Sequence, residues 1–262
     1  MLTKLFSIKK YYDEQSFLIK SFNILGMSIP YEKCYGISDK SNEIFVVDSG
    51  ENRKLNKMEQ GLVIKVEGKN NKIYIDKNLQ KRGLLIIVLG NDNVVKIGAV
   101  SNFNDSRILV QGDKNNVVFE DSCDIMRNLH LNCPTSNSTF YIGKDSSILG
   151  AEIDLRTQNA NIKIGKECML SNDITIMSGD GHKIIDKTTG EPIHKKGFVK
   201  IGERVWIGKG AVVCKNTNIP SGSIVGANSI VTKSFDEENI ILAGVPAKIV
   251  KHNVEWTREY IF

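Results

Sequence analysis

A polar segment in the second half of the chain gathers residues that can do acid–base chemistry. Residues 178–197, with the sequence SGDGHKIIDKTTGEPIHKKG, contain two of the four histidines. A histidine with an ordinary pKa of about 6.5 is largely neutral at pH 7, so His182 can take a proton from a poor nucleophile such as a sugar hydroxyl. Asp180, Asp186 or a backbone carbonyl could hold its ring in the correct tautomer. The position equally fits a solvated loop histidine.

Acyl transfer from a thioester to a hydroxyl is one reaction that such a base could serve. A thioester is already activated, so the enzyme must add a base at the attacking hydroxyl and hydrogen-bond donors at the carbonyl oxygen. We expect His182 to be the base and backbone N–H groups at a turn to hold the tetrahedral oxyanion. Direct transfer to the acceptor is favoured over a covalent acyl-enzyme, because the cysteines have structural explanations.

The five cysteines indicate reduced structural thiols. Their number is odd and no CxxC occurs, which is typical of a reducing compartment and not of a disulfide framework. Cys168 and Cys214 fall at a small-residue position and a turn position of the repeat described below. A zinc site needs three histidines brought together, whereas His130 and His252 lie far from His182 in the repeat. We therefore predict no metal.

A repeat runs through the middle of the chain and must position these residues. An apolar-x-apolar phrase recurs with its second members 22, 22, 23 and 22 residues apart, at Ile75, Ile97, Phe119, Ile142 and Ile164. In the first three copies an asparagine stands two places before the phrase, and we assign these asparagines to tight turns. Recurrence at this period predicts a solenoid.

The C-terminal third shortens the period to a hexapeptide. Aliphatic residues stand six apart at Ile201, Ile207, Val213, Ile219, Val225 and Val231. Three short strands of about six residues make one triangular coil with one aliphatic residue per face pointing inward. The strict hexads favour a left-handed parallel β-helix over a right-handed one and over a sandwich of short strands.

One insertion interrupts this repeat. The gap between Ile164 and Ile201 is 37 residues, 15 more than the usual 22, and the excess falls within residues 178–197. Long loops that leave an economical scaffold are usually functional. His182 stands six residues after Ile176, which predicts that it takes the next inward position. Alternation points Trp206 outward, as a platform for a sugar ring or pantetheine or as packing between subunits.

The ends of the chain do not follow the repeat. Residues 1–65 suggest one or two amphipathic helices and a strand from Glu43 to Val47, and we expect a small cap or α+β domain. A cap over the first coil is favoured over acceptor binding or membrane-surface attachment. Residues 66–247 form the β-helix domain, and residues 248–262 a C-terminal tail with a short helix.

Composition excludes several classes of protein. The 262 residues are 41% hydrophobic and 25% charged, which excludes disorder and fibrous low complexity. No apolar run reaches the roughly 18 residues of a membrane span, and lysines interrupt the N-terminal stretch, so we expect a cytoplasmic protein. The charge excess of 35 − 30 = 5 is too small and scattered to indicate nucleic acid binding.

The sequence from residue 140 to 251 resembles a known family. The segments SGDGH, VKIGERVWIGKGAVV, SIVGANSIVTKSF and LAGVPAKIVK, in this order and spacing, are similar to the hexapeptide-repeat acyltransferases. The resemblance is greatest to O-acetyltransferases of galactosides, maltose and surface polysaccharides, including sialic acid capsules. It implies a homotrimer of left-handed β-helices with acetyl-CoA in the groove between subunits. The N-terminal segment, the 22-residue coils and the tail depart from compact members of the family.

The resemblance also implies site residues. His182 matches the family's catalytic histidine, Trp206 its tryptophan, and Lys233 and Lys248 positions that meet the phosphates of coenzyme A. Further candidates from the repeat itself complete the set. Backbone amides could line the pantetheine arm at Gly208, Gly226 and Ala227. Two loop lysines could attract an anionic acceptor, Lys195 and Lys196.

The function expected from these residues is acetyl-CoA-dependent O-acetylation of a cell-surface carbohydrate or its precursor. N-acetylation of a nucleotide-linked amino sugar would use the same base and the same donor. A non-catalytic β-helix that binds glycans is the alternative from another class, and it predicts no affinity for CoA.

Overall fold

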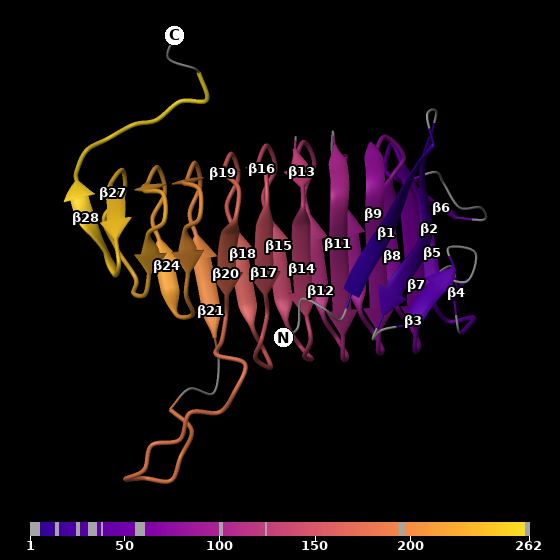
Figure 1. Cartoon of the computed structure of the whole chain (residues 1–262), viewed down its shortest axis with the longest axis horizontal. Coiled ribbons are helices and arrows are strands. Elements are labelled where there is room, and N and C mark those ends of the chain that lie inside the picture. Colours follow the sequence, from indigo (N-terminus) through magenta and orange to yellow (C-terminus); the bar gives the residue numbers. More distant parts are fainter. Residues whose placement is uncertain are drawn as a thin grey trace.

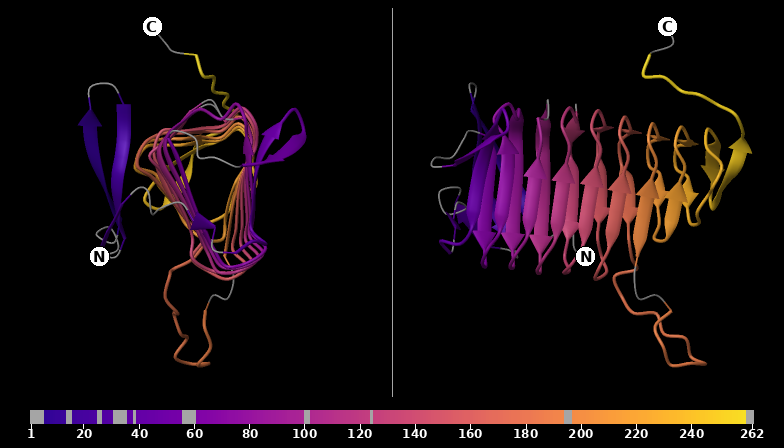
Figure 2. Two further views of the ribbon diagram at one scale, coloured as in Figure 1. Left: turned by 90° about the vertical axis from the view of Figure 1, so that its right-hand side faces the viewer. Right: turned by 180° about the vertical axis from the view of Figure 1, so that it is seen from behind.

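The computed structural model shows a long solenoid of parallel strands with a triangular cross-section (Figures 1 and 2). It describes residues 6–13, 16–24, 27–30, 36–37, 39–55, 61–99, 102–123, 125–193 and 197–259. The predicted left-handed parallel β-helix is confirmed. No helical segment in the described part of the chain has the length and hydrophobicity that a bilayer crossing needs.

Face 1 of the solenoid is a sheet that runs from the first coils to the last. Its parallel strands are β5 (Glu43–Asp48), β8 (Lys72–Asp76), β10 (Val94–Ile97), β12 (Asn116–Phe119), β15 (Thr139–Ile142), β18 (Asn161–Ile164), β21 (Phe198–Ile201) and β24 (Thr217–Ile219). Antiparallel β6 (Glu51–Lys54) borders β5. β5 confirms the predicted strand at Glu43, and its pairing with β8 carries the parallel stack N-terminal of residue 66.

Faces 2 and 3 are joined in the early coils by long strands that bend from one face to the other, β9 (Lys81–Leu89) and β11 (Phe103–Gln111). Face 2 continues as β13 (Met126–Arg127), β16 (Ser147–Ile148), β19 (Met169–Leu170), β22 (Trp206–Ile207), β25 (Ile224–Val225) and β27 (Ile241–Gly244). Face 3 comprises β7 (Leu62–Glu67), then β14 (Leu129–Cys133), β17 (Ala151–Asp154), β20 (Ile174–Met177), β23 (Val212–Val213) and β26 (Ile230–Val231). Antiparallel β28 (Ala247–Lys251) closes the last coil against β27.

The helices predicted at the two ends are wrong for the described residues. β1 (Phe6–Asp13), β2 (Ser16–Ile24) and β3 (Met27–Pro30) form an antiparallel sheet, and β4 (Gly36–Ile37) pairs in parallel with β7. Their sequences are rich in aromatic and β-branched residues, which fit strands better than helices. Residues 252–259 have no regular secondary structure.

The core is a set of inward columns in which equivalent residues of successive coils stack. On face 1, Val95, Val117 and Phe140 occupy one register position in three consecutive coils and are fully buried. The Phe119 ring contacts the rings of Phe103 and Phe140, with centroids 5.5 and 5.2 Å away. Burial of each such side chain contributes about 1.5–3 kcal/mol, so the stack fixes the register of the faces and corners.

The repeated asparagines do not make the tight turns to which the sequence analysis assigns them. The residue before each one takes the left-handed conformation instead, as at Asp92 with a φ of 57°. Asn71, Asn93 and Asn115 are buried and form a ladder along the solenoid. The Asn93 side-chain amide donates to Oδ1 of Asn71 at 3.0 Å, and Oδ1 of Asn93 accepts from the backbone of Asn115 at 2.9 Å. The ladder satisfies polar groups that an apolar core would leave unpaired.

Three corners separate the faces and carry the candidate residues. The loop corner joins face 3 to face 1, the tail corner joins face 1 to face 2, and the back corner joins face 2 to face 3. The loop corner comprises residues 156–160, 178–193, 197, 214–216 and 232–234. The tail corner comprises Asp145, Glu167 and Arg204, and the back corner comprises residues 208–210 and 226–228.

Candidate active site

The predicted loop leaves the solenoid at the loop corner (Figure 2). β20 ends at Met177, and the chain re-enters face 1 at Phe198. Both stems are packed tightly at the root: Ser178, Gly179 and Gly197 are buried, and Gly197 lies against the Ser178 carbonyl oxygen so closely that no Cβ fits there. Gly181, with a φ of 79°, then turns the chain outward.

His182 is exposed, so its predicted inward position is wrong. The inward run ends at Ile176, because the chain turns out of the coil before the next hexad is complete. An exposed imidazole three residues beyond the buried Gly179 remains accessible to an acceptor. Among the described residues, none forms a hydrogen bond with the ring.

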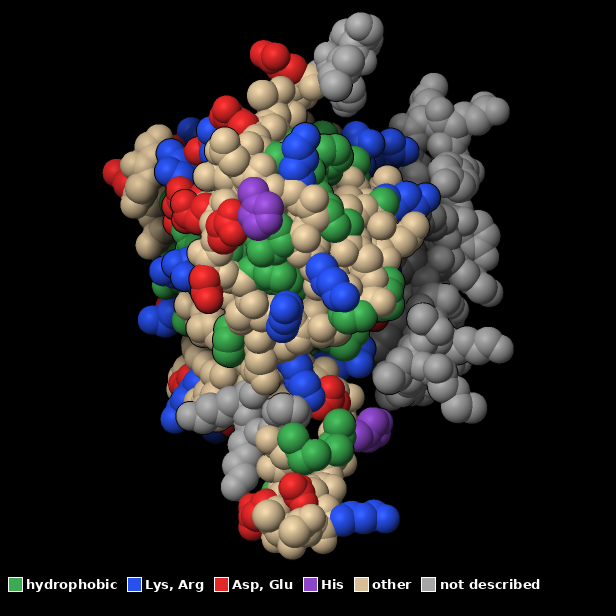
Figure 3. Space-filling model, turned by 90° about the vertical axis from the view of Figure 1, so that its left-hand side faces the viewer, with side chains coloured by type: hydrophobic (Ala, Val, Ile, Leu, Met, Phe, Trp, Pro, Cys, Tyr) green, Lys and Arg blue, Asp and Glu red, His purple; other side chains and the backbone are tan. Residues whose placement is uncertain are grey.

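Beyond His182 the loop is a hairpin that projects from the body, with apolar side chains near its base (Figure 3). Ile184, Ile185 and Ile193 are each about half exposed. The carboxylate of Asp186 accepts from the backbone N–H groups of Thr188 and Thr189, at 2.7 and 3.2 Å, and these bonds lower its pKa. This carboxylate therefore serves the turn of the hairpin. Lys195 and Lys196 lie outside the described residues.

Asp180 is the nearer of the two candidate carboxylates to the loop root. It forms an ion pair with Lys215 of the next coil, which the sequence analysis missed. The pair is partly shielded, with 18% of the Lys215 side chain and 35% of the Asp180 side chain exposed. It ties the outgoing stem of the loop to the loop corner. Lys215 stands in the turn after a hexad valine, a position that gives no sign of its partner in sequence.

A second polar group that sequence reasoning missed lies in the coil before the loop. Arg156 donates through Nε and Nη2 to Oδ2 of Asp154, at 3.1 and 2.5 Å. Oδ1 of Asp154 accepts from Asn132 at 2.9 Å, so this buried carboxylate is fully engaged. A Cβ on Gly181 would lie 3.6 Å from Cδ of Arg156. The arginine therefore packs beneath the turn that presents His182.

Trp206 points outward from face 2, as predicted, and the C-terminal tail packs on part of it, which leaves it half-buried. Its ring centroid is 6.1 Å from that of Trp256, and the planes are inclined at 47°. Trp256 is buried and donates from Nε1 to the carbonyl oxygen of Arg204 at 2.8 Å. The Trp206 Nε1 atom is buried with no hydrogen-bond partner among the described residues. Trp206 thus serves as packing for the tail in the single chain.

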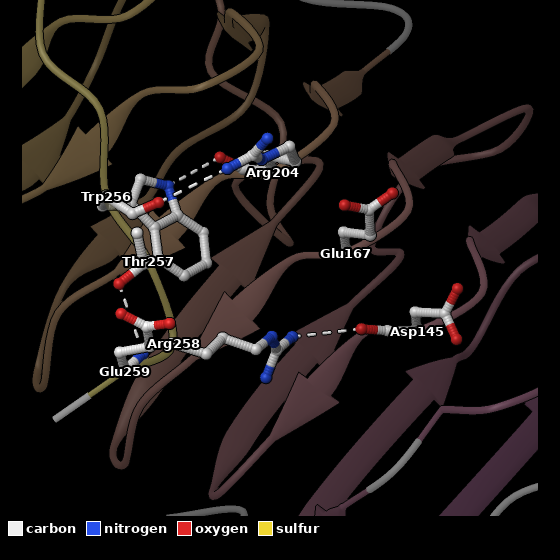
Figure 4. Close-up of a pocket in the computed structure, with 7 residues that line it drawn as sticks. All are labelled: Asp145, Glu167, Arg204, Trp256, Thr257, Arg258 and Glu259. Atoms are coloured by element: carbon white, nitrogen blue, oxygen red, sulfur yellow. Dashed lines mark hydrogen bonds between the residues drawn. The ribbon is translucent and has the colours of Figure 1, made fainter.

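The tail and the tail corner enclose a cleft of about 660 Å³ (Figure 4). Arg258 anchors the tail there, because its guanidinium donates at 3.0 Å to Ser147 Oγ and to the carbonyl oxygens of Asp145 and Cys168. Glu167 and Arg204 line the same cleft. These bonds link the tail to coils 90 to 113 residues earlier.

The candidates for coenzyme A divide between two regions. Gly208 and Gly226 lie at the back corner, and their N–H groups already donate to the carbonyls of Val225 and Leu242, so these amides are not available to pantetheine. Ala227 beside them is exposed. Lys233 is exposed on the loop corner with its Nζ 5.3 Å from the Phe235 ring centroid, and Lys248 is exposed on β28.

Within one chain the two best candidates face away from each other. His182 stands on the loop corner, while Trp206 stands on face 2, which is opposite that corner of the triangle. Asp180 and Lys233 share the corner with His182; Gly208, Gly226, Ala227 and Lys248 share the region of Trp206. A single chain therefore does not bring the candidate base and the candidate aromatic platform together.

The chain is similar in sequence to enzymes that transfer acetyl groups to carbohydrates. No family model matches the chain. A polysialic acid O-acetyltransferase of Neisseria meningitidis is 34% identical to it over 194 residues, which cover 74% of this chain and 88% of that protein. The chain belongs to the hexapeptide-repeat acyltransferase family. As a member of this family, it is an acyltransferase.

Other members of the hexapeptide-repeat acyltransferase family are similar over shorter spans or in fold. The galactoside O-acetyltransferase of Escherichia coli (strain K12) is 31% identical over 122 residues, 39% of this chain and 60% of that protein. The crystal structure of the polySia specific acetyltransferase NeuO has a TM-score of 0.56 and 24% identity, and the match covers 85% of this chain and 84% of that chain. This likeness confirms the fold.

The four thiols in the described part of this acyltransferase are poorly suited to act as nucleophiles. Cys123, Cys133 and Cys168 are fully buried, and burial raises the pKa of each to about 12. Burial also raises the pKa of Cys214. Since the thiolate is the reactive form, none of these four side chains is poised for acyl transfer near neutral pH. Among the described residues, no three potential ligands are grouped as a metal site.

Proposed function

We propose that this protein is an acetyl-CoA-dependent O-acetyltransferase that acts on a cell-surface carbohydrate. The observation that carries the proposal is an exposed histidine at the packed root of the single inserted loop, in a chain 34% identical to a polysialic acid O-acetyltransferase. The galactoside O-acetyltransferase among its relatives supports a sugar hydroxyl as the acceptor.

In the proposed reaction His182 is the general base. One ring nitrogen takes the proton of the acceptor hydroxyl as its oxygen attacks the thioester carbonyl carbon. The tetrahedral intermediate then collapses with cleavage of the carbon–sulfur bond, and the imidazolium returns the proton to the departing CoA thiolate. A base of this kind contributes about 10²- to 10⁴-fold to the rate.

Assembly into a trimer would complete the site. The outward positions of face 2 in the later coils are apolar and partly exposed at Met169, Trp206 and Ile224, and those of face 3 at Val212 and Ile230. Face 3 of one copy can pack on face 2 of the next, and three such heterologous contacts close a ring. The loop corner of one copy then borders the Trp206 face of its neighbour, with acetyl-CoA between them.

The test is turnover by the full chain with matched histidine variants. His182→Ala should abolish nearly all CoA release with a carbohydrate acceptor and leave acetyl-CoA binding close to normal. His252→Ala is the control, because this histidine is exposed near the far end of the solenoid and pairs with Glu237. Unchanged turnover in His182→Ala would refute the assignment.

Two further measurements separate the alternatives. A panel that offers hydroxyl and amino sugars distinguishes O-acetylation from N-acetylation, since CoA release follows the preferred nucleophile. A thermal shift with CoA distinguishes an enzyme from a glycan-binding solenoid, because the latter has no reason to bind the nucleotide.

A further inference from the structure

A single outward column on face 1 combines aromatic rings with lysines. Its members occupy one register position in successive coils, and the strands that carry them are parallel neighbours. The column comprises Phe45, Tyr74, Lys96, Val118, Tyr141, Lys163, Lys200 and Asn218. Because adjacent strands lie about 4.8 Å apart, the five steps from Tyr74 to Lys200 span about 24 Å.

The rings and the lysines of the column contact each other. Phe45 and Tyr74 are stacked with centroids 5.1 Å apart and planes inclined at 18°. Lys96 Nζ lies 5.6 Å from the Tyr74 centroid, and Lys163 Nζ lies 5.3 Å from the Tyr141 centroid. The tyrosines are half-buried and the lysines exposed, so the column presents flat apolar surface flanked by ammonium groups.

The charged members of the column are all lysines, Lys96, Lys163 and Lys200, whereas the carboxylates of face 1 stand beside it at Glu43, Asp76 and Glu120. The neighbouring outward column adds Lys72, and its one carboxylate, Glu43, forms an ion pair with Lys54 at 3.1 Å. No described carboxylate lies within ion-pair distance of Lys96, Lys163 or Lys200. At the tail-corner edge, Glu120 is engaged, since its carboxylate accepts from the Lys144 backbone at 3.1 Å and bonds to Tyr141.

The column also leads to the candidate site. Lys200 lies in β21, the strand that begins directly after the buried loop root at Gly197. Phe198, the first residue of that strand, is 45% exposed beside it. Faces 2 and 3 carry the apolar outward residues in the later coils, so face 1 stays open to solvent when copies pack as proposed above.

We propose that this column is a binding track for a linear polysaccharide that bears carboxylates, and that it delivers the polymer to the loop corner. Delivery of the polymer to the loop corner rests on the proposed function, whereas binding of the polymer to the column does not. Ring faces of sugars pack on half-buried tyrosines, and lysines spaced along a row match carboxylates spaced along a chain. The tyrosines are half-buried, whereas rings that anchor a protein in a membrane would be exposed.

The test measures binding apart from turnover. Lys96→Gln, Lys163→Gln and Lys200→Gln are combined in a His182→Ala background, and binding of fluorescent polysialic acid and of polygalacturonate is followed by anisotropy. Loss of three modest surface interactions should weaken the affinity for at least one polymer about tenfold and reduce its salt dependence. Lys251→Gln on β28, away from the column, is the control and should bind as the parent does.

Each outcome decides the proposal. Binding of a polymer that falls in the triple variant, with an unchanged melting temperature, supports the track; Lys163→Gln alone should show a smaller loss in the same direction. Equal binding by the parent and the triple variant overturns it, as does a parent that binds neither polymer at low salt. Binding to anionic phospholipid vesicles is measured in parallel. If the triple substitution weakens binding to the vesicles and to neither polymer, the column is a membrane-binding surface and the proposal is overturned. A parent with intact His182 that binds polymer but never releases CoA would refute the proposed function and leave the track standing.

Discussion

Replacing Gly197 by alanine should disable the loop root without unfolding the solenoid. A Cβ atom on Gly197 would overlap the carbonyl oxygen of Ser178, far inside the 3.0 Å that real Cβ atoms keep. The Ser178 carbonyl carbon would lie 2.7 Å away, and the nearest atom outside Ser178 would be Thr157 Oγ1 at 3.3 Å. Because the first obstacle is backbone, the two stems of the loop must separate by more than 1 Å. A misplacement of about 1 Å can already cost about 10²-fold in rate. We expect Gly197→Ala to lower kcat/KM by about two orders of magnitude.

The assay is CoA release at saturating acetyl-CoA, together with thermal unfolding followed by circular dichroism. Gly150→Ala is the matched control, since its Cβ would sit 3.5 Å from the Asp173 nitrogen, an ordinary contact. The control should keep its rate, and both variants should keep the melting transition of the solenoid. Full activity in Gly197→Ala would show that the root does not set the position of His182.

Three other predictions follow from the fold. Asn93→Ala removes the 2.9 Å bonds that the side chain makes to the Asn115 N–H and to the Gly112 carbonyl. The free energy of unfolding, measured with urea, should fall by about 2–4 kcal/mol. The exposed control Asn116→Ala should lower it by less than about 0.5 kcal/mol. Trp256→Ala leaves Trp206 as the one remaining tryptophan and removes the ring that packs on it. The emission maximum of Trp206 should shift to longer wavelength as the ring becomes more exposed to water, and an unchanged spectrum would contradict the tail packing. Burial raises the pKa of Cys133 to about 12 from 9.0, so the folded state favours the neutral thiol and loses stability as pH rises from 9 toward 12; the urea midpoint should fall over that range, and less in Cys133→Ala.

The repeat could be predicted because each coil buries the same positions. Ile162 pairs with Val199 across the insertion, in the register that the hexapeptide spacing predicts. Cys168 illustrates the same logic at a single residue: it is buried at the small-residue position, and its Sγ donates to the Gly202 carbonyl at 3.1 Å. Periodic burial is a local signal, and it survives in the sequence.

Contacts between coils could not be predicted in this way. The ion pair of Asp180 with Lys215 joins residues 35 apart in the chain, and the Arg258 bonds reach back 111 residues to Ser147. Polar side chains on corners and tails have no period, so sequence spacing gives no register for them. The inward position predicted for His182 failed for a related reason, since a hexad count assumes that the chain is still coiling.

The location of the insertion would let one corner serve both substrates of the proposed reaction. The loop corner is the edge at which lysine-bearing face 1 meets face 3, whose later outward residues, Val212 and Ile230, are apolar. A group at this edge can be reached by a polymer from the solvent side and by a donor held against a neighbouring copy. Moving the loop to the back corner would enclose it between two apolar faces and cut it off from face 1. If the variant chain carrying the loop there still acetylated a polymer, the division of roles among the faces would be wrong.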